Sequence, residues 1–155
     1  KSIANSLNVT AEKRGRATLS LANLAILDTS IYIDNLRSGR FKQEILDLKF
    51  VVRCSAVVLA ELSRGARSPL MRRFVDGLAK NLHVIAPNER EWLESGRIVN
   101  RLGEAKGYDI QKTREIHFDV LIALTARRIG AHLITCNVDD FTAIHEHLNF
   151  NLVCW

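Results

Sequence analysis

The fold of this chain is decided by the stretch LAILDTS at residues 24–30. A short apolar run of this kind predicts a strand buried on both faces, as in a parallel sheet. Asp28 ends the run and is followed by Thr29 and Ser30. In open α/β sheets, sites form outside the carboxyl ends of the strands. Asp28 is therefore expected at the edge of the sheet where a site would lie.

Short apolar runs and longer helical patterns alternate through the rest of the chain. Strands are expected at residues 24–27, 50–54, 82–85, 132–135 and 150–153, and helices at residues 34–48, 56–66, 70–80, 89–106, 112–128 and 140–147. Ser55 and Asn88 are suited to cap the helices that follow them. Strands that alternate with helices in this way predict a parallel sheet covered by helices on both faces.

The composition is that of one globular domain with a basic extension. The chain has 155 residues, of which 47% are hydrophobic and 25% charged, and its net charge is +5. This balance fits one domain, and the positive charge favours a polyanionic partner. Residues 1–20 carry four basic side chains and one acidic side chain, a net charge of +3 that leaves +2 for the rest. We expect a basic N-terminal extension at residues 1–23, most simply a solvated arm, and a domain at residues 24–155.

The cysteines and the missing motifs argue against a zinc site, a nucleotide cofactor and a membrane protein. Cys54, Cys136 and Cys154 are odd in number and lie in or beside apolar runs, which predicts buried, reduced packing residues in a cytoplasmic protein. No Cys or His spacing suggests zinc, since the histidines of the HEH sequence at residues 145–147 do not share a helix face. Neither GxGxxG nor GxxxxGK[ST] occurs, so no nucleotide cofactor is expected. The apolar stretches are shorter than the ~20 residues that span a bilayer, so no membrane association is expected.

Three acids stand in unusually apolar surroundings. Asp28 follows a buried strand, Glu61 lies within AVVLAEL at residues 56–62, and Asp119 lies within FDVLIAL at residues 118–124. A buried carboxylate is costly unless it is paired or binds a metal. Each acid alone could equally be a structural ion pair or a helix end, so the argument depends on the set. Asp140, after the strand at residues 132–135, is a fourth candidate, and its neighbour Asp139 could take its place.

Carboxylates gathered at one sheet edge would repel one another. Two like charges ~4 Å apart cost about 4 kcal/mol at an effective dielectric constant near 20. A divalent cation removes this penalty, and oxygen ligands without cysteine select Mg²⁺ or Mn²⁺. Such an ion makes a bound water a better nucleophile and neutralises charge on a phosphodiester.

Four short motifs, in this order, resemble those of PIN-domain nucleases, most closely the VapC-like toxins of type II toxin–antitoxin systems. The motifs are DTS at residues 28–30, SxxxxAEL at residues 55–62, FDxxIAxTA at residues 118–126 and TxNxxDF at residues 135–141. The resemblance covers residues 25–153. It implies a Rossmann-like, three-layer α/β/α fold and Mg²⁺- or Mn²⁺-dependent endoribonuclease activity on RNA. It also implies a homodimer and inhibition by a cognate VapB-like antitoxin.

The resemblance also implies roles for individual residues. Asp28, Glu61, Asp119 and Asp140 match the catalytic and metal-binding acids, of which the fourth is the least regular, and Thr29, Ser30, Thr135 and Asn137 match supporting polar positions. Thr135 and either Thr29 or Ser30 would orient the acids, water or substrate. The basic extension departs from the family pattern, because such toxins usually begin almost at the first strand.

Other interpretations stay open beside this one. The chain could be a housekeeping PIN-domain ribonuclease without an antitoxin, or an antitoxin-binding module with weak catalysis. An aspartyl intermediate at Asp28 is disfavoured, because Ser30 stands where a second acid would be needed. Five basic residues near Glu61 form a solvated face or contact phosphate; they are Arg64, Arg67, Arg72, Arg73 and Lys80.

Four further residues are expected to pack or to be solvated rather than to take part in catalysis. Trp92 and Trp155 are expected to pack in the dimer or domain core rather than stack on bases. His117, two residues from Asp119, is expected to face away from it. Glu115 is expected to be solvated or to pair with a neighbouring basic residue, with contact to the metal through water as the alternative.

Overall fold

Five parallel strands form the centre of the molecule. The computed structural model describes residues 23–155, so the predicted extension at residues 1–23 lies almost wholly outside the described residues. The strands are β1 (Leu24–Leu27), β2 (Val51–Ser55), β3 (His83–Ile85), β4 (His132–Thr135) and β5 (Asn151–Cys154). Their order is β3-β2-β1-β4-β5, and every neighbouring pair is parallel. The predicted parallel sheet is confirmed.

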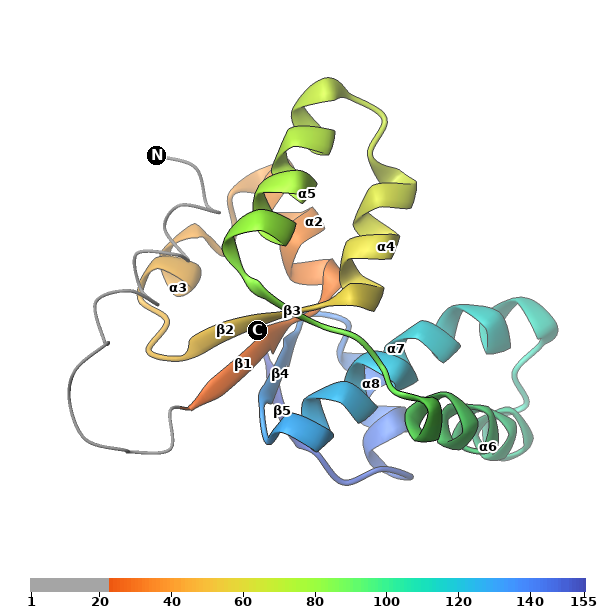
Figure 1. Cartoon of the computed structure of the whole chain (residues 1–155). Coiled ribbons are helices and arrows are strands. Elements are labelled where there is room, and N and C mark those ends of the chain that lie inside the picture. The colour runs from red at the N-terminus through yellow and green to blue at the C-terminus, as the bar shows by residue number, and fades with distance from the viewer. Residues whose placement is uncertain (1–22) are drawn as a thin grey trace.

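Helices cover both faces of this sheet. One group comprises α2 (Thr29–Ser38), α3 (Lys42–Leu46), α4 (Ala56–Gly65) and α5 (Pro69–Asn81), and the other comprises α6 (Glu89–Lys106), α7 (Ile110–Ile129) and α8 (Val138–His145). Figure 1 shows the first group on one side of the sheet and the second group on the other. The predicted three-layer α/β/α fold is therefore confirmed.

The sheet has a topological switch point between β1 and β4. From β1 the chain proceeds outward to β2 and β3, then returns to place β4 on the other side of β1. Asp28, directly after β1, donates its backbone N–H to the carbonyl oxygen of Ile134 in β4 at 2.8 Å. Ligands of open α/β sheets bind at such a point, outside the carboxyl ends of the strands.

The predicted helix at residues 34–48 is wrong. Two helices occupy the region, and the first begins at Thr29 because the Asp28 side chain caps it by accepting from the backbone N–H of Ser30. Gly39, with a φ of 69°, ends α2 in the left-handed conformation, so the chain turns before α3. The other predicted helices and strands exist, and their ends differ from the prediction by at most two residues; α7, for example, begins at Ile110, which follows its cap Asp109.

Helix α7 forms the largest part of the core on its face of the sheet. Its residues from Val120 to Ala126 are all fully buried, as the apolar sequence around Asp119 predicts. None of the helices in residues 23–155 is both long and apolar enough to cross a membrane. The prediction that all three cysteines are buried is confirmed for Cys54 and wrong for the other two, because Cys136 is half-buried and Cys154, the last residue of the edge strand β5, is exposed.

Candidate active site

All four predicted acids line one cavity. The cavity has a volume of about 870 Å³ and is walled by α2, α4, α7, the start of α8 and the turns before α2 and α8. Asp28, Glu61, Asp119 and Asp140 all contribute to its walls. The structure thus brings together carboxylates that come from four separate segments, at the switch point of the sheet.

Asp28 is the most deeply placed of these acids. Its side chain is 2% exposed, and one oxygen, Oδ2, accepts from Ser30 Oγ at 2.6 Å and from Thr135 Oγ1 at 3.0 Å. The other oxygen, Oδ1, is buried and has no hydrogen-bond partner within the described residues. Burial raises the pKa of this carboxyl, against the lowering effect of its hydrogen bonds. One oxygen is therefore held rigidly, and the other is left for a ligand.

Thr29 couples the first segment to Glu61 on α4. Its hydroxyl donates to Glu61 Oε2 at 2.6 Å, so adjacent residues of one turn orient two different carboxylates. Burial raises the pKa of Glu61, and the nearby Asp28 charge raises it further, while Thr29 and Arg64 act in the opposite direction. Glu61 is only half buried, unlike the expectation of a largely buried position.

Asp119 on α7 lies near the charges of three other acids. Burial raises its pKa well above the usual range, and the neighbouring charges of three acids add to the shift; these are Asp28, Glu61 and Asp140. Lys112 partly offsets them. Asp119 Oδ2 has a long contact of 3.5 Å with Asn137 Nδ2. A carboxylate in this position is stabilised by any cation that enters the cavity.

Asp140, at the start of α8, differs from the other acids because it already has a cationic partner. Lys112 Nζ lies 2.6 Å from Asp140 Oδ1 and 2.8 Å from Oδ2, and Asn137 Nδ2 donates to Oδ2 at 3.0 Å. The neighbouring Asp139 is exposed and does not line the cavity. Between the two candidates for the fourth acid, the geometry therefore favours Asp140.

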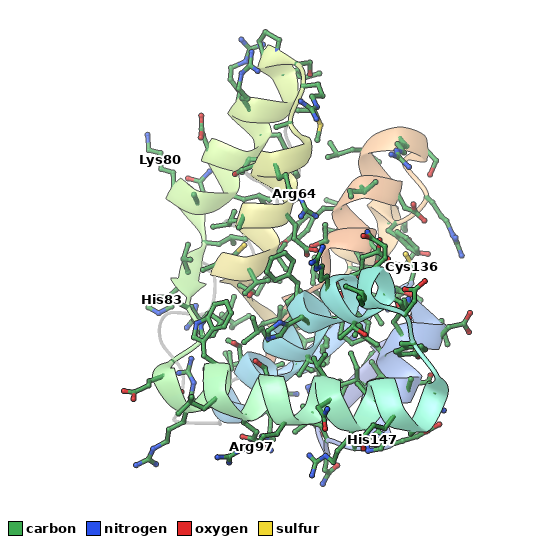
Figure 2. All side chains as sticks on the ribbon, turned by 90° about the vertical axis from the view of Figure 1, so that its right-hand side faces the viewer. Arg64, Lys80, His83, Arg97, Cys136 and His147 are labelled. Atoms are coloured by element: carbon green, nitrogen blue, oxygen red, sulfur yellow. The ribbon has the colours of Figure 1, made fainter. Side chains whose placement is uncertain are left out.

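The rim of the cavity is basic and aromatic. Figure 2 shows Arg64 on α4 at the side facing α7, and its guanidinium carbon lies 5.8 Å from the centre of the Phe118 ring. Arg114 also lines the cavity. In the same figure Lys80 projects outward from the end of α5, away from this rim. Of the five basic residues near Glu61, only Arg64 lines the cavity.

The comparisons with known proteins agree with this geometry. The profile of the PIN domain matches residues 25–146, most of the chain. The chain belongs to the PIN domain family. Members of this family are in general nucleases. A search of curated proteins gave no significant match.

Solved structures of toxin–antitoxin complexes share the fold of this PIN domain. A chain of VapBC-1 from nontypeable Haemophilus influenzae is 28% identical with a TM-score of 0.63, and the match covers 85% of this chain and 98% of that one. A chain of VapBC2 from Rickettsia felis, bound to a promoter DNA fragment, is 26% identical with a TM-score of 0.60 and the same coverage. A chain of the DNA-bound VapBC from Salmonella typhimurium, at 22% identity over 86% of this chain and 98% of that one, shows the same fold with a TM-score of 0.61.

The residues of this PIN domain fit a hard divalent cation. Asp28 Oδ1 is an unpartnered, buried anionic oxygen, and within residues 23–155 neither Asp28, Glu61 nor Asp119 forms an ion pair. In the same part of the chain, no three His, Cys, Asp or Glu side chains are grouped as closely as a bound ion requires. To share one ion, the carboxylates would have to move closer together, and a cation between them would offset their mutual repulsion.

Three further residues of α7 lie near Asp119. His117 contributes to the cavity wall, and its Nε2 lies 2.8 Å from Ser95 Oγ on α6. Glu115 is exposed, as expected for a solvated charge, and accepts from Gln111 at 2.6 Å. Lys112 was missed as a site residue. It lies seven residues, or two helical turns, before Asp119, so helical periodicity places the two on one face.

The two tryptophans differ in how they pack. Trp155 packs against the ring of Phe41, with centroids 5.7 Å apart, as expected for a packing residue. Trp92 is 48% exposed in the single chain, at the start of α6. Its expected burial in the domain core is therefore wrong, and its burial in a dimer stays a prediction.

Proposed function

We propose that this PIN domain is a Mg²⁺- or Mn²⁺-dependent endoribonuclease and the toxin of a VapBC-type toxin–antitoxin pair. The observation that carries the proposal is the unpartnered, buried Oδ1 of Asp28, a residue that lines one cavity together with Glu61 and Asp119. A binding module without catalysis gives no reason to place three unpaired carboxylates in one cavity. The VapBC structures support the assignment to a toxin, because relatives at 28% and 26% identity come from such pairs.

Asp28, Glu61 and Asp119 would hold the divalent ion. When bound, the ion supplies the positive charge that neutralises the phosphodiester and makes water a better nucleophile. Ser30 and Thr135 hold Asp28, and Thr29 holds Glu61, so the acids are oriented before substrate arrives. The assigned roles of Asp140 in metal binding and catalysis stay a prediction, as do the supporting roles of Asn137 and its neighbours.

The cavity rim supplies the contacts that a polyanion needs. Arg64 and Arg114 line the opening, where their charges would bind phosphates on either side of the scissile bond. Phe118 beside Arg64 offers an apolar ring at the same rim. RNA is the expected substrate, since single-stranded segments can lie in an open cavity of this size and contact aromatic and arginine side chains.

The proposed partners are a VapB-like antitoxin and a second copy of the chain. Trp92 and Leu93 at the start of α6 are 48% and 62% exposed, and a homodimer would bury apolar side chains of this kind. Light scattering of the purified protein measures the oligomeric state. A strictly monomeric protein with unchanged solubility over a wide concentration range would contradict the homodimer.

The test of activity is cleavage of total cellular RNA with Mg²⁺ or Mn²⁺, with and without EDTA, followed by mapping of the cut ends. We expect cleavage that requires the ion and is lost in Asp28→Asn and Asp119→Asn while both variants stay folded. Equal cleavage by wild type and variants would overturn the assignment. Growth arrest on expression, relieved by co-expression of an adjacent reading frame, separates the toxin from a housekeeping ribonuclease.

A further inference from the structure

Lys112 forms an ion pair with Asp140, one of the four acids that line the cavity. Its ammonium group lies within 2.6 and 2.8 Å of the two Asp140 oxygens, and Asn137 takes a further position on Oδ2 at 3.0 Å. Both oxygens of this carboxylate therefore have charged or polar donors directed at them. The side chain of Asp140 is 16% exposed and that of Lys112 is 33% exposed, so the pair is partly shielded from water. A partly shielded ion pair is screened less than one on the open surface.

The other three acids, unlike Asp140, have few donors directed at their oxygen atoms. Within residues 23–155, Asp28 Oδ1 has no partner, and Glu61 accepts one hydrogen bond, on Oε2 from Thr29. In the same residues, the one hydrogen bond to the Asp119 carboxylate is the long contact with Asn137. Oxygen atoms free to bind a cation are thus concentrated on three of the four acids, and the fourth is neutralised from within the protein.

We propose that Lys112 is a built-in replacement for a second metal ion, so that this PIN domain binds one divalent ion instead of two. The inference rests on the proposed metal-dependent function and specifies its metal content. The single ion would be held by Asp28, Glu61 and Asp119. A second ion at Asp140 would have to displace the ammonium group or sit beside it, and like charges at such separations repel strongly.

The position of Lys112 in α7 makes this arrangement part of the fold. Lys112 lies in the first turn of α7, where its backbone N–H is capped by Asp109 Oδ1 at 2.7 Å. Its side chain is one-third exposed, and the ammonium group lies 5.9 Å from the centre of the Tyr108 ring. Two helical turns separate it from Asp119 on the same face, so one helix supplies both a ligand for the ion and the competing cation.

Equilibrium binding of Mn²⁺ to the full chain tests the proposal without relying on activity. Isothermal titration calorimetry and electron paramagnetic resonance of free Mn²⁺ count the bound ions. We expect one ion for the wild type and two for Lys112→Met, with the second lost again in the double variant Lys112→Met with Asp140→Asn. Lys112→Arg keeps the charge and should still bind one ion. Lys106→Met is the matched control, since Lys106 forms a 2.8 Å ion pair with Glu146 outside the cavity.

The number of bound ions tests the one-ion inference and the metal-dependent function separately. Two ions on the wild type, or one ion on a folded Lys112→Met, would overturn the inference and leave the metal-dependent nuclease intact. No Mn²⁺ binding to the wild type would overturn both. If Lys112→Met fails to fold, Lys112→Gln at the same position provides the neutral variant. A gain of the second ion in either variant supports the replacement of a metal by Lys112.

Discussion

Thr135, the last residue of β4, donates a hydrogen bond of 3.0 Å to Asp28 Oδ2, just beyond β1, across a separation of 107 residues in sequence. The same hydroxyl oxygen accepts from the backbone N–H of Asn137 at 2.9 Å. One buried side chain thus connects the first acid of the cavity to the turn that leads to the last. The two adjacent strands hold the site together at their carboxyl ends.

Thr135→Val should weaken the proposed ion binding without removing a ligand. The substitution removes one of the two hydroxyl groups that hold Asp28 Oδ2, and outer contacts of this kind typically contribute 10- to 100-fold to metal affinity. Mn²⁺ titration monitored by calorimetry measures the change. Thr125→Val is the matched control, because within the described residues that buried hydroxyl bonds only to Leu121 O of its own helix, at 2.9 Å. Equal effects of the two variants on Mn²⁺ affinity would contradict a positioning role for Thr135.

Asp119→Asn should abolish cleavage and stabilise the metal-free protein. Burial and three neighbouring acids raise the pKa of Asp119 well above its usual range, so its charged form is unfavourable at neutral pH. We expect a gain in unfolding free energy on the order of 1 kcal/mol at pH 7, measured by urea denaturation in EDTA.

The exposed neighbour Asp139 is the control for this prediction. Asp139→Asn removes an acid from the first turn of α8, where a negative charge interacts favourably with the helix N-terminus. It should therefore lower stability slightly, by roughly 0.3–1 kcal/mol, and leave cleavage in place. Destabilisation by Asp119→Asn instead would show that its carboxylate is a structural partner.

The stability of the metal-free protein should fall as pH rises above about 4. The folded state raises the pKa of Asp28, Glu61 and Asp119, so in this range it holds protons that the unfolded chain has released. By linkage, this contribution is complete below the unfolded-state pKa of about 4 and is lost as pH passes through the raised values. Thermal unfolding in EDTA between pH 4 and 8 measures it.

Divalent ion should reverse this loss of stability. Added Mg²⁺ or Mn²⁺ binds the deprotonated acids of the folded state, so the melting temperature at pH 8 should rise with ion concentration. The Asp119→Asn variant should show a shallower decline with pH and a smaller response to the ion. A melting temperature that does not respond to either ion at pH 8 would argue against binding by these acids.

Arg64→Met should weaken binding of single-stranded RNA and reduce its salt dependence. Arg64 lines the cavity beside Phe118, and one lost phosphate contact lowers the slope of log affinity against log salt by about 0.7. Fluorescence anisotropy with catalytically inactive Asp119→Asn as background measures this slope. Arg72→Met on the exposed face of α5 should leave both affinity and slope nearly unchanged. Identical slopes for the two variants would place RNA elsewhere.

The succession of strands and helices along the chain was determined by the sequence, because local hydrophobic periodicity carries that information. The apolar run at residues 24–27 and the alternation after it were sufficient to predict a parallel sheet between helical layers. Caps were equally readable: Ser55 accepts from Val57 N–H, and Asn88 forms a capping box with Glu91. The same kind of signal, Asp28 as a cap and Gly39 as a terminator, was available at α2 and was overlooked.

The partners of each charged group were decided only by the tertiary structure. Three of the acids were predicted from their apolar surroundings, Asp140 from its place after a strand, and all four from family motifs; all four line the cavity. Asp28 Oδ1 has no partner in the described residues, whereas Asp140 forms an ion pair with Lys112. This difference depends on how α7 and α8 pack against each other beyond the sheet. Sequence periodicity indicates which face of a helix a side chain occupies. Pairing across two helices depends on distances of a few ångströms, which the packing of the whole core sets.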